Sequence, residues 1–264
     1  MTRKAGTPMR VALTVAGSDS GGGAGIQADL KTFHALGVFG ASAITCLTAQ
    51  NPRRITALRP VVPDLVAEQM ERVLEAFPVR AAKTGMLHTA AIVERVADVF
   101  RRRRFHPIVV DPVMVAGSGA VLLKKDALRV LVNDLFPQAA VVTPNRHEAE
   151  VLARRAVRTR DGMREAARAL TDTFGVPFLV KGGHLPEHGR AVDVLFDGRQ
   201  FHEFGAPFAP GLKTHGTGCT FSAAIAAHLA LGYGLAESVH RAKLFVTRSI
   251  RCAVRIGNHH ALNP

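Results

Sequence analysis

The sequence predicts a single α/β domain in three layers, with a mostly parallel central sheet covered by helices on both faces. Short runs of β-branched and apolar residues alternate with longer amphipathic stretches along nearly the whole chain. Strands that are apolar throughout are typical of parallel sheets buried on both sides. No internal repeat, low-complexity linker or break in composition divides the 264 residues. We therefore expect a flexible tail at residues 1–10 and one domain over residues 11–264.

The predicted strands are short and bounded by turn-forming residues. They lie at Val11–Ala16, Ala41–Thr45, Ile55–Val62, Ala81–Lys83, Ile108–Val110, Ala140–Val142 and Phe178–Val180. Two further runs, Val192–Phe196 and Gln200–Glu203, are joined through Asp197-Gly198 and predict an antiparallel hairpin.

The clearest helices follow the 3.6-residue period. They are expected at Ile26–Leu36, Pro63–Ala76, Thr89–Arg103, Thr217–Leu231 and Ala236–Ile256. Beyond the last of these, His259 and His260 are expected in a frayed end. Ligands of open parallel sheets bind beyond the carboxyl ends of the strands, so the residues that follow each strand are the candidates for function.

The chain is strongly basic, with 34 Lys and Arg against 21 Asp and Glu and a formal charge of +13. Such a charge attracts nucleic acid, anionic membranes or acidic small molecules. Trp is absent, Tyr occurs once and no nucleic-acid motif is visible, which argues against nucleic acid. No apolar run is long enough for a membrane helix. We expect acidic small-molecule substrates, no nucleic-acid or membrane partner, and a cytoplasmic location.

A glycine-rich loop, Gly17–Gly25, follows the first strand. It is not a Walker A loop, because no Gly-Lys-Ser/Thr follows, and Ile26 breaks the Gly-x-Gly-x-x-Gly spacing. The loop alone therefore fits a flexible turn as well as a nucleotide site. Asp29, one turn into the next helix, either faces the loop or is solvated.

The segment Thr214-His215-Gly216-Thr217-Gly218-Cys219-Thr220 precedes a long alanine-rich helix. Glycines at a helix start leave backbone N–H groups free to hold a phosphoryl group, and the helix dipole favours its charge. The same dipole is expected to lower the pKa of the Cys219 thiol. The alternative is a glycine turn followed by a small buried cysteine.

Three other strand ends carry polar side chains. Asp111 and Lys181 each end a buried strand, whereas Asn145 and Glu148 stand three residues apart where a helix follows a strand. Oxygen ligands of this kind suit Mg²⁺. Asn145 and Glu148 equally fit an N-cap and capping box, and the two interpretations do not exclude each other. Asp111 and Lys181 equally fit turn-starting residues.

Taken together, these segments resemble one family over nearly the whole chain. They are Ala16–Asp19, Gly21–Asp29, Thr48–Asn51, Lys83–Leu87, Asp111–Met114, Thr143–Asn145 with Glu148, Lys181–His184 and Thr214–Thr220. The chain looks like a hydroxymethylpyrimidine/phosphomethylpyrimidine kinase of thiamine biosynthesis, in the ribokinase-like superfamily. The resemblance implies a ribokinase-like fold, ATP as phosphoryl donor, Mg²⁺ and a homodimer.

The resemblance also implies a role for each matched residue. Gly216, Thr217, Gly218 and Cys219 would form the catalytic anion hole, with Cys219 activating the 5-hydroxymethyl oxygen. Gln50 would bind the aminopyrimidine edge, in a pocket shared with Gly17, Asp29, Met86 and Val113. Asn145 and Glu148 would hold the Mg²⁺–phosphate assembly with Asp111 beside them, and Lys181 and Thr214 would bind the nucleotide.

The implied reaction is phosphorylation of 4-amino-5-hydroxymethyl-2-methylpyrimidine to its monophosphate and then to its diphosphate. Alternatives are a pyridoxine or pyridoxal kinase of the same superfamily and a ligand-binding relative without catalysis. One departure concerns the second step, because Gly117 stands where the family more often has lysine. If that lysine binds phosphate, the second phosphorylation requires another cation.

Overall fold

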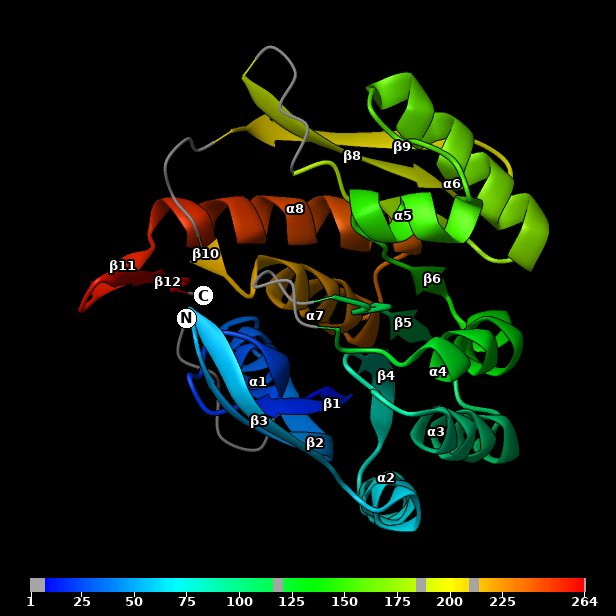
Figure 1. The fold of residues 1–264 in the computed structure, drawn as a ribbon, viewed down its shortest axis with the longest axis vertical. Coiled ribbons are helices and arrows are strands. Elements are labelled where there is room, and N and C mark those ends of the chain that lie inside the picture. Colours follow the sequence, from blue (N-terminus) through cyan, green and yellow to red (C-terminus); the bar gives the residue numbers. More distant parts are fainter. Residues whose placement is uncertain (1–7, 116–120, 184–188, 209–213, 264) are drawn as a thin grey trace.

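The centre of the molecule is a nine-stranded sheet, in a computed structural model that describes residues 8–115, 121–183, 189–208 and 214–263. The strand order is β3-β2-β1-β4-β5-β6-β7-β8-β9 (Figure 1). The strands are β1 (Val11–Asp19), β2 (Phe39–Asn51), β3 (Arg54–Pro60), β4 (Val79–Thr84), β5 (Ile108–Val110), β6 (Val141–Val142), β7 (Phe178–Val180), β8 (Arg190–Phe196) and β9 (Phe201–Pro207). Neighbours from β2 to β7 are parallel, while β3, β8 and β9 pair antiparallel. The mostly parallel sheet and the β8–β9 hairpin are confirmed.

Helices cover both faces of this sheet, which confirms the three-layer arrangement (Figure 1). One face carries α1 (Gly25–Ala35), α7 (Thr217–Ala230) and α8 (Leu235–Arg251). The other carries α2 (Pro63–Ala76), α3 (Ala90–Arg103), α4 (Lys125–Val130), α5 (Arg146–Ala153) and α6 (Arg160–Phe174). Among the described residues, no helix has the length and apolarity needed to cross a membrane.

Alternate residues of the central strands pack into two separate hydrophobic cores, one on each face of the sheet. In β5, Ile108 and Val110 join the core beneath α2–α6, whereas Val109 joins the core beneath α1, α7 and α8. In β7, Leu179 likewise faces the second core, between Phe178 and Val180, which face the first. Because side chains of a strand alternate between faces, a strand buried on both sides must be apolar at every position.

Helix α7 lies against both the sheet and α8, and most of its residues are buried. Alanines from Ala223 to Ala227 supply much of its surface. Small side chains let the helix axis come close to the strands, so the helix start lies directly at the strand ends. Its N-cap, Gly216, has a φ of +83°, in the left-handed region that favours glycine.

The C-terminal expectation was wrong in two respects. Helix α8 ends at Arg251, not at Ile256, and the chain then forms β11 (Val254–Ile256) and β12 (His259–Ala261). These strands build a second sheet with β10 (Thr214–His215), so His259 and His260 lie in a strand and not in a frayed end. The two residues between the strands, Gly257-Asn258, are a hairpin signal, and Gly257 has a φ of +58°.

A buried ion pair fastens α8 to the antiparallel side of the sheet. Asp193 of β8 accepts the Lys243 ammonium at 2.8 Å and the Gly182 backbone N–H at 2.9 Å. The two side chains are 4% and 9% exposed. Removing one charge of such a pair leaves the other without a partner in a low-dielectric interior.

We therefore expect Asp193→Ala to lower the free energy of unfolding by about 3–5 kcal/mol. The double variant Asp193→Ala/Lys243→Met should lose less, because no buried charge is left unpaired. Urea denaturation of both proteins measures the difference. Equal losses in the single and the double variant would show that the unpaired ammonium is not the cause.

Candidate active site

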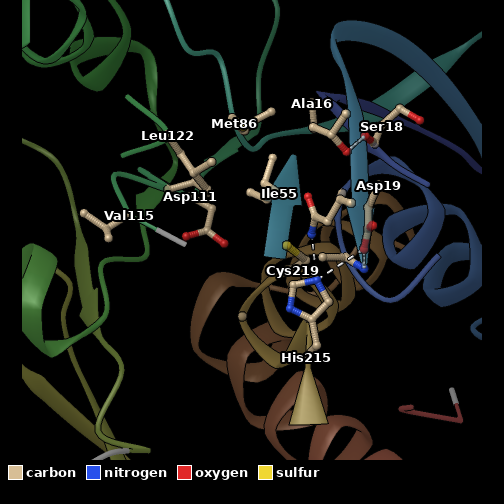
Figure 2. Close-up of a pocket in the computed structure, with 18 of the residues that line it drawn as sticks. Ala16, Ser18, Asp19, Ile55, Met86, Asp111, Val115, Leu122, His215 and Cys219 are labelled. Carbon is tan, nitrogen blue, oxygen red and sulfur yellow. Dashed lines mark hydrogen bonds and ion pairs between the residues drawn. The ribbon is translucent and has the colours of Figure 1, made fainter. Parts of the chain in front are cut away.

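A cavity of about 200 Å³ opens where the carboxyl ends of the parallel strands meet the start of α7 (Figure 2). Most of the residues expected at the site line it, namely Gly17, Gln50, Met86, Asp111, Val113, Asn145, Glu148, Lys181, Gly216, Gly218 and Cys219. Thr217 is the first residue of α7, next to the cavity. Thr214 lies in β10, and Gly117 lies outside the described residues.

The start of α7 makes close backbone contact with the glycine loop after β1. A Cβ atom on Gly216 would lie 1.7 Å from the carbonyl oxygen of Gly23, so only glycine fits. On the cavity side, a Cβ atom on Gly218 would lie 3.5 Å from the Lys181 ammonium. The first turn of α7 thus lies close to the largely buried Lys181 ammonium at the cavity, which is an arrangement suited to an anion.

Asp111 and Lys181 form an ion pair at the ends of β5 and β7. The Lys181 ammonium donates to one Asp111 carboxylate oxygen at 2.9 Å, and the Ser222 hydroxyl of α7 donates to the other at 3.0 Å. Burial alone would lower the pKa of Lys181, but the carboxylates of Asp111 and Glu148 outweigh it and raise the pKa. Lys181 is therefore a fixed positive charge. Ser222 was missed in the sequence, where it reads as one more small residue of the alanine-rich helix.

Asn145 and Glu148 form a complete capping box at the start of α5. The Glu148 N–H donates to the Asn145 side-chain oxygen at 3.0 Å, and the Asn145 N–H donates to the Glu148 carboxylate at 2.8 Å. The second Glu148 oxygen accepts the Met114 N–H at 3.1 Å. Glu148 therefore ties the loop after β5 to the start of α5, and both side chains still border the cavity.

Burial raises the pKa of Glu148; Lys181 opposes this effect, and the nearby Asp111 carboxylate adds to it. Two carboxyl groups, those of Asp111 and Glu148, thus lie near one ammonium, that of Lys181. The described residues contain no group of three or more His, Cys, Asp or Glu side chains that could enclose a metal ion. The two carboxylates of Asp111 and Glu148 fit Mg²⁺, which usually takes one or two carboxylates and completes its shell with water and phosphate oxygens.

Asp29, which was expected in the substrate pocket, does not line the cavity. Asp29 is fully buried, and its carboxylate contacts the Lys83 ammonium at 2.9 and 3.1 Å and the Thr14 hydroxyl at 2.6 Å. The helix turns this residue towards the sheet, because β1 and β4 carry its polar partners beneath the cavity. Lys83, which the sequence analysis left without a role, borders the cavity instead.

The expected low pKa of Cys219 was also wrong. Burial raises the pKa of the thiol; the Lys83 ammonium lowers it, and the carboxylates of Asp29 and Asp111 raise it again. The start of α7 does not offset this burial. Cys219 is therefore a neutral thiol at pH 7, partly exposed to the cavity (Figure 2).

A second polar cluster, which the sequence analysis did not assign, lies across the cavity. The His215 ring nitrogen Nε2 lies 3.0 Å from the Gln50 amide nitrogen and 3.2 Å from an Asp19 carboxylate oxygen (Figure 2). Burial would raise the pKa of Asp19, but hydrogen bonds from His215, Gly21 and Ala24 lower it. These residues stand 165 and 196 positions from His215 along the chain, so only the fold reveals the cluster.

Apolar groups close the wall between the two polar clusters. A Cβ atom on Gly17 would lie 2.3 Å from the terminal methyl carbon of Met86, so the two residues are in direct contact. Val113 borders the cavity with a φ of +42°, a conformation that costs a β-branched residue free energy. Strain of this kind is typical of functional positions, because the surrounding structure must impose it.

The fold and site define a small-molecule kinase, with a helix start and a largely buried lysine beside one cavity at the strand ends. A sequence model of the family described as phosphomethylpyrimidine kinase matches residues 19–263. The chain belongs to this family.

Several known proteins are similar over most of the chain. A hydroxymethylpyrimidine/phosphomethylpyrimidine kinase of Rhizobium meliloti is 47% identical over 247 residues, 93% of this chain and 92% of that protein. The thiamine biosynthesis bifunctional protein ThiED of Geobacter sulfurreducens is 48% identical over 258 residues; the match covers 98% of this chain but only 52% of ThiED. A solved structure of Bacillus subtilis pyridoxal kinase with ADP has a TM-score of 0.89 and 37% identity, and 97% of each chain is covered.

We expect alkylation of Cys219 by iodoacetamide to be slow at pH 7. The rate should rise about tenfold for each pH unit above 7 until the pKa of the thiol is reached, since only the thiolate reacts. The raised pKa is the cause. A Cys252→Ser protein removes the exposed cysteine, and peptide mass spectrometry follows Cys219. A rate that has already levelled off at pH 7 would show a lowered pKa.

Proposed function

We propose that this protein transfers the γ-phosphoryl group of ATP to 4-amino-5-hydroxymethyl-2-methylpyrimidine, and then phosphorylates the monophosphate to the diphosphate, in thiamine biosynthesis. One observation carries the proposal. A single cavity brings the start of α7 with Cys219 to the same space as Gln50, Met86 and Val113. Membership of the phosphomethylpyrimidine kinase family supports the same substrate class.

The substrate side of the cavity suits a flat ring with one polar edge. Met86, Val113 and the backbone of Gly17 supply apolar contact area, and Gln50 supplies an amide with both a donor and an acceptor. An aminopyrimidine offers a matching pair, its exocyclic amine as donor and the adjacent ring nitrogen as acceptor. Pyridoxal and pyridoxine lack this pair, although similarity to a pyridoxal kinase keeps them as the alternative substrates.

Transfer proceeds in line across the start of α7. The N–H groups of Gly218 and Cys219, with the Lys181 ammonium, stabilise the charge on the transferring group. A bond forms between phosphorus and the hydroxymethyl oxygen while the bond to the ADP oxygen breaks. The hydroxyl proton passes to the sulfur of the Cys219 thiolate, the form left once the thiol has given its own proton to water. The raised pKa makes this thiolate scarce at pH 7 but strongly basic.

Mg²⁺ bound with the nucleotide would neutralise phosphate charge at the site. Asp111 and Glu148 would hold it, Asn145 would contact the phosphate assembly, and Thr214 and Lys181 would complete the nucleotide side. Cys46, Cys219 and Cys252 are free thiols, which agrees with a cytoplasmic protein.

We also propose a homodimer. Apolar side chains lie exposed around β2 and α2, where Leu47, Val62 and Leu65 are each more than half exposed and Phe39 packs on Phe77. A second copy of the chain would remove this surface from water.

The purified protein is expected to form ADP from ATP only when Mg²⁺ and the hydroxymethylpyrimidine are both present. Cys219→Ala should lower kcat at least about a hundredfold, because general acid–base groups contribute this much or more. Cys252→Ala, which removes the exposed cysteine, is the matched control and should be unchanged. A coupled ADP assay measures all three proteins.

Two further substrates complete this test. The isolated monophosphate should be converted to the diphosphate, and pyridoxal should be the poorer substrate by kcat/KM. Absence of pyrimidine-dependent turnover, an unimpaired Cys219→Ala variant, or a preference for pyridoxal would each contradict the proposed function.

A further inference from the structure

His215 stands between the phosphoryl side and the substrate side of the cavity. It directly precedes Gly216, and its backbone is held in β10, where it pairs with Ala261 of β12. Its side chain is 29% exposed and is directed at Asp19 (Figure 2). It also contacts the Gln50 amide. The second sheet, formed with the C-terminal strands, therefore places an imidazole beside the residue that is expected to read the substrate.

Asp19 is itself immobilised. One carboxylate oxygen accepts the Gly21 N–H at 2.8 Å, and the other accepts the N–H groups of Ala24 at 2.8 Å and Gly23 at 3.1 Å. The Asp19 backbone N–H donates to the Gln27 side chain at 2.8 Å. The Asp19 carboxylate thus has a fixed position beside the His215 imidazole, and it limits the positions that the ring can adopt.

Gln50 is fixed at its backbone but not at its amide. The Gln50 N–H donates to the Ser20 hydroxyl at 2.8 Å, and that hydroxyl donates to the Gln50 carbonyl at 2.9 Å. The side-chain amide could still turn over and exchange its oxygen and nitrogen, unless a neighbour distinguishes them. Among the described residues, His215 is the side chain recorded in contact with this amide.

Nε2 of His215 lies 3.2 Å from an Asp19 carboxylate oxygen, which can only accept, so the ring proton is on Nε2. The same N–H lies 3.0 Å from the Gln50 amide, and it selects the orientation in which the amide oxygen faces the ring. The contact occupies one lone pair of the amide oxygen. The second lone pair of this oxygen and an N–H remain together as an acceptor–donor pair. That pair is complementary to the amine and ring nitrogen of an aminopyrimidine.

We propose that His215 is a positioning residue for substrate recognition: it holds the Gln50 amide in the one orientation that presents both its oxygen and an N–H to the aminopyrimidine edge. The inference rests on the proposed function, and it goes further by assigning the choice between pyrimidine and pyridine substrates to the His215–Gln50 pair. His215 acts through Gln50 and does not itself touch the substrate.

The test is a double-mutant cycle on pyrimidine KM, with kcat and the KM of ATP measured in parallel. His215→Leu is expected to raise the pyrimidine KM about tenfold, the equivalent of one hydrogen bond of about 1.4 kcal/mol. Gln50→Ala should raise it at least as much. Adding His215→Leu to Gln50→Ala should then change the pyrimidine KM less than twofold, because the amide that His215 orients is gone.

Two controls separate positioning from damage to the fold. His215→Gln keeps a hydrogen-bond donor and should recover most of the pyrimidine KM, and the KM of ATP should be unchanged in all variants. Selectivity for the pyrimidine over pyridoxal should fall in His215→Leu, and no further in the double variant.

The outcomes are decisive in each case. If His215→Leu changes the pyrimidine KM by the same factor in the wild type and in Gln50→Ala, the positioning role is overturned. A loss confined to kcat would overturn it as well. The proposed function would stand in both cases. A wild-type protein that turns over pyridoxal but not the pyrimidine would overturn the proposed function, and the role of His215 with it.

Discussion

The close backbone contact between Gly216 and Gly23 is the constraint on which the rest of the site depends. Residues of the loop after β1 and residues at the start of α7 both line the cavity. No side chain separates the two, because a Cβ atom at Gly216 would collide with the Gly23 carbonyl. The small residues of α7 allow this approach by letting the helix lie close to the strands, and β12 holds β10 in place on the other side.

Buried lysines paired with carboxylates give the molecule its internal electrostatics. Lys83 pairs with Asp29, Lys181 with Asp111, and Lys243 with Asp193, each joining elements far apart in the sequence. Pairs of this kind add little net stability relative to apolar residues, but breaking one is costly, so they fix where charges lie. Two of them border or underlie the cavity, where they raise the pKa of Lys181 and modulate that of Cys219. The formal charge of +13 describes the whole chain and defines none of these positions.

The layered fold and most of the residues that line the cavity could be predicted from the sequence, because both follow from local patterns. The run Ile108–Val110 is apolar at every position since both faces of its strand are covered, and Asp111 ends it where a parallel sheet opens to ligand. Asp29 was misassigned because one helical turn does not reveal what lies beneath it. The C-terminal hairpin was missed because its partner, β10, lies some forty residues earlier, and the contact of His215 with Asp19 joins nearly opposite ends of the chain. Such long-range contacts also reversed the expected effect on Cys219, where burial outweighs the helix start.

The most direct test of this account is the turnover of Gly216→Ala beside Gly232→Ala. Both glycines flank α7 with positive φ, +83° and +96°, but only Gly216 has backbone within reach of a Cβ atom. The account predicts that Gly216→Ala loses kcat by about a hundredfold, comparable to the loss of a preorganised donor, while Gly232→Ala loses some stability but keeps kcat. A Gly216→Ala protein that turns over at the wild-type rate would contradict the central claim that this contact aligns the phosphoryl group with its acceptor.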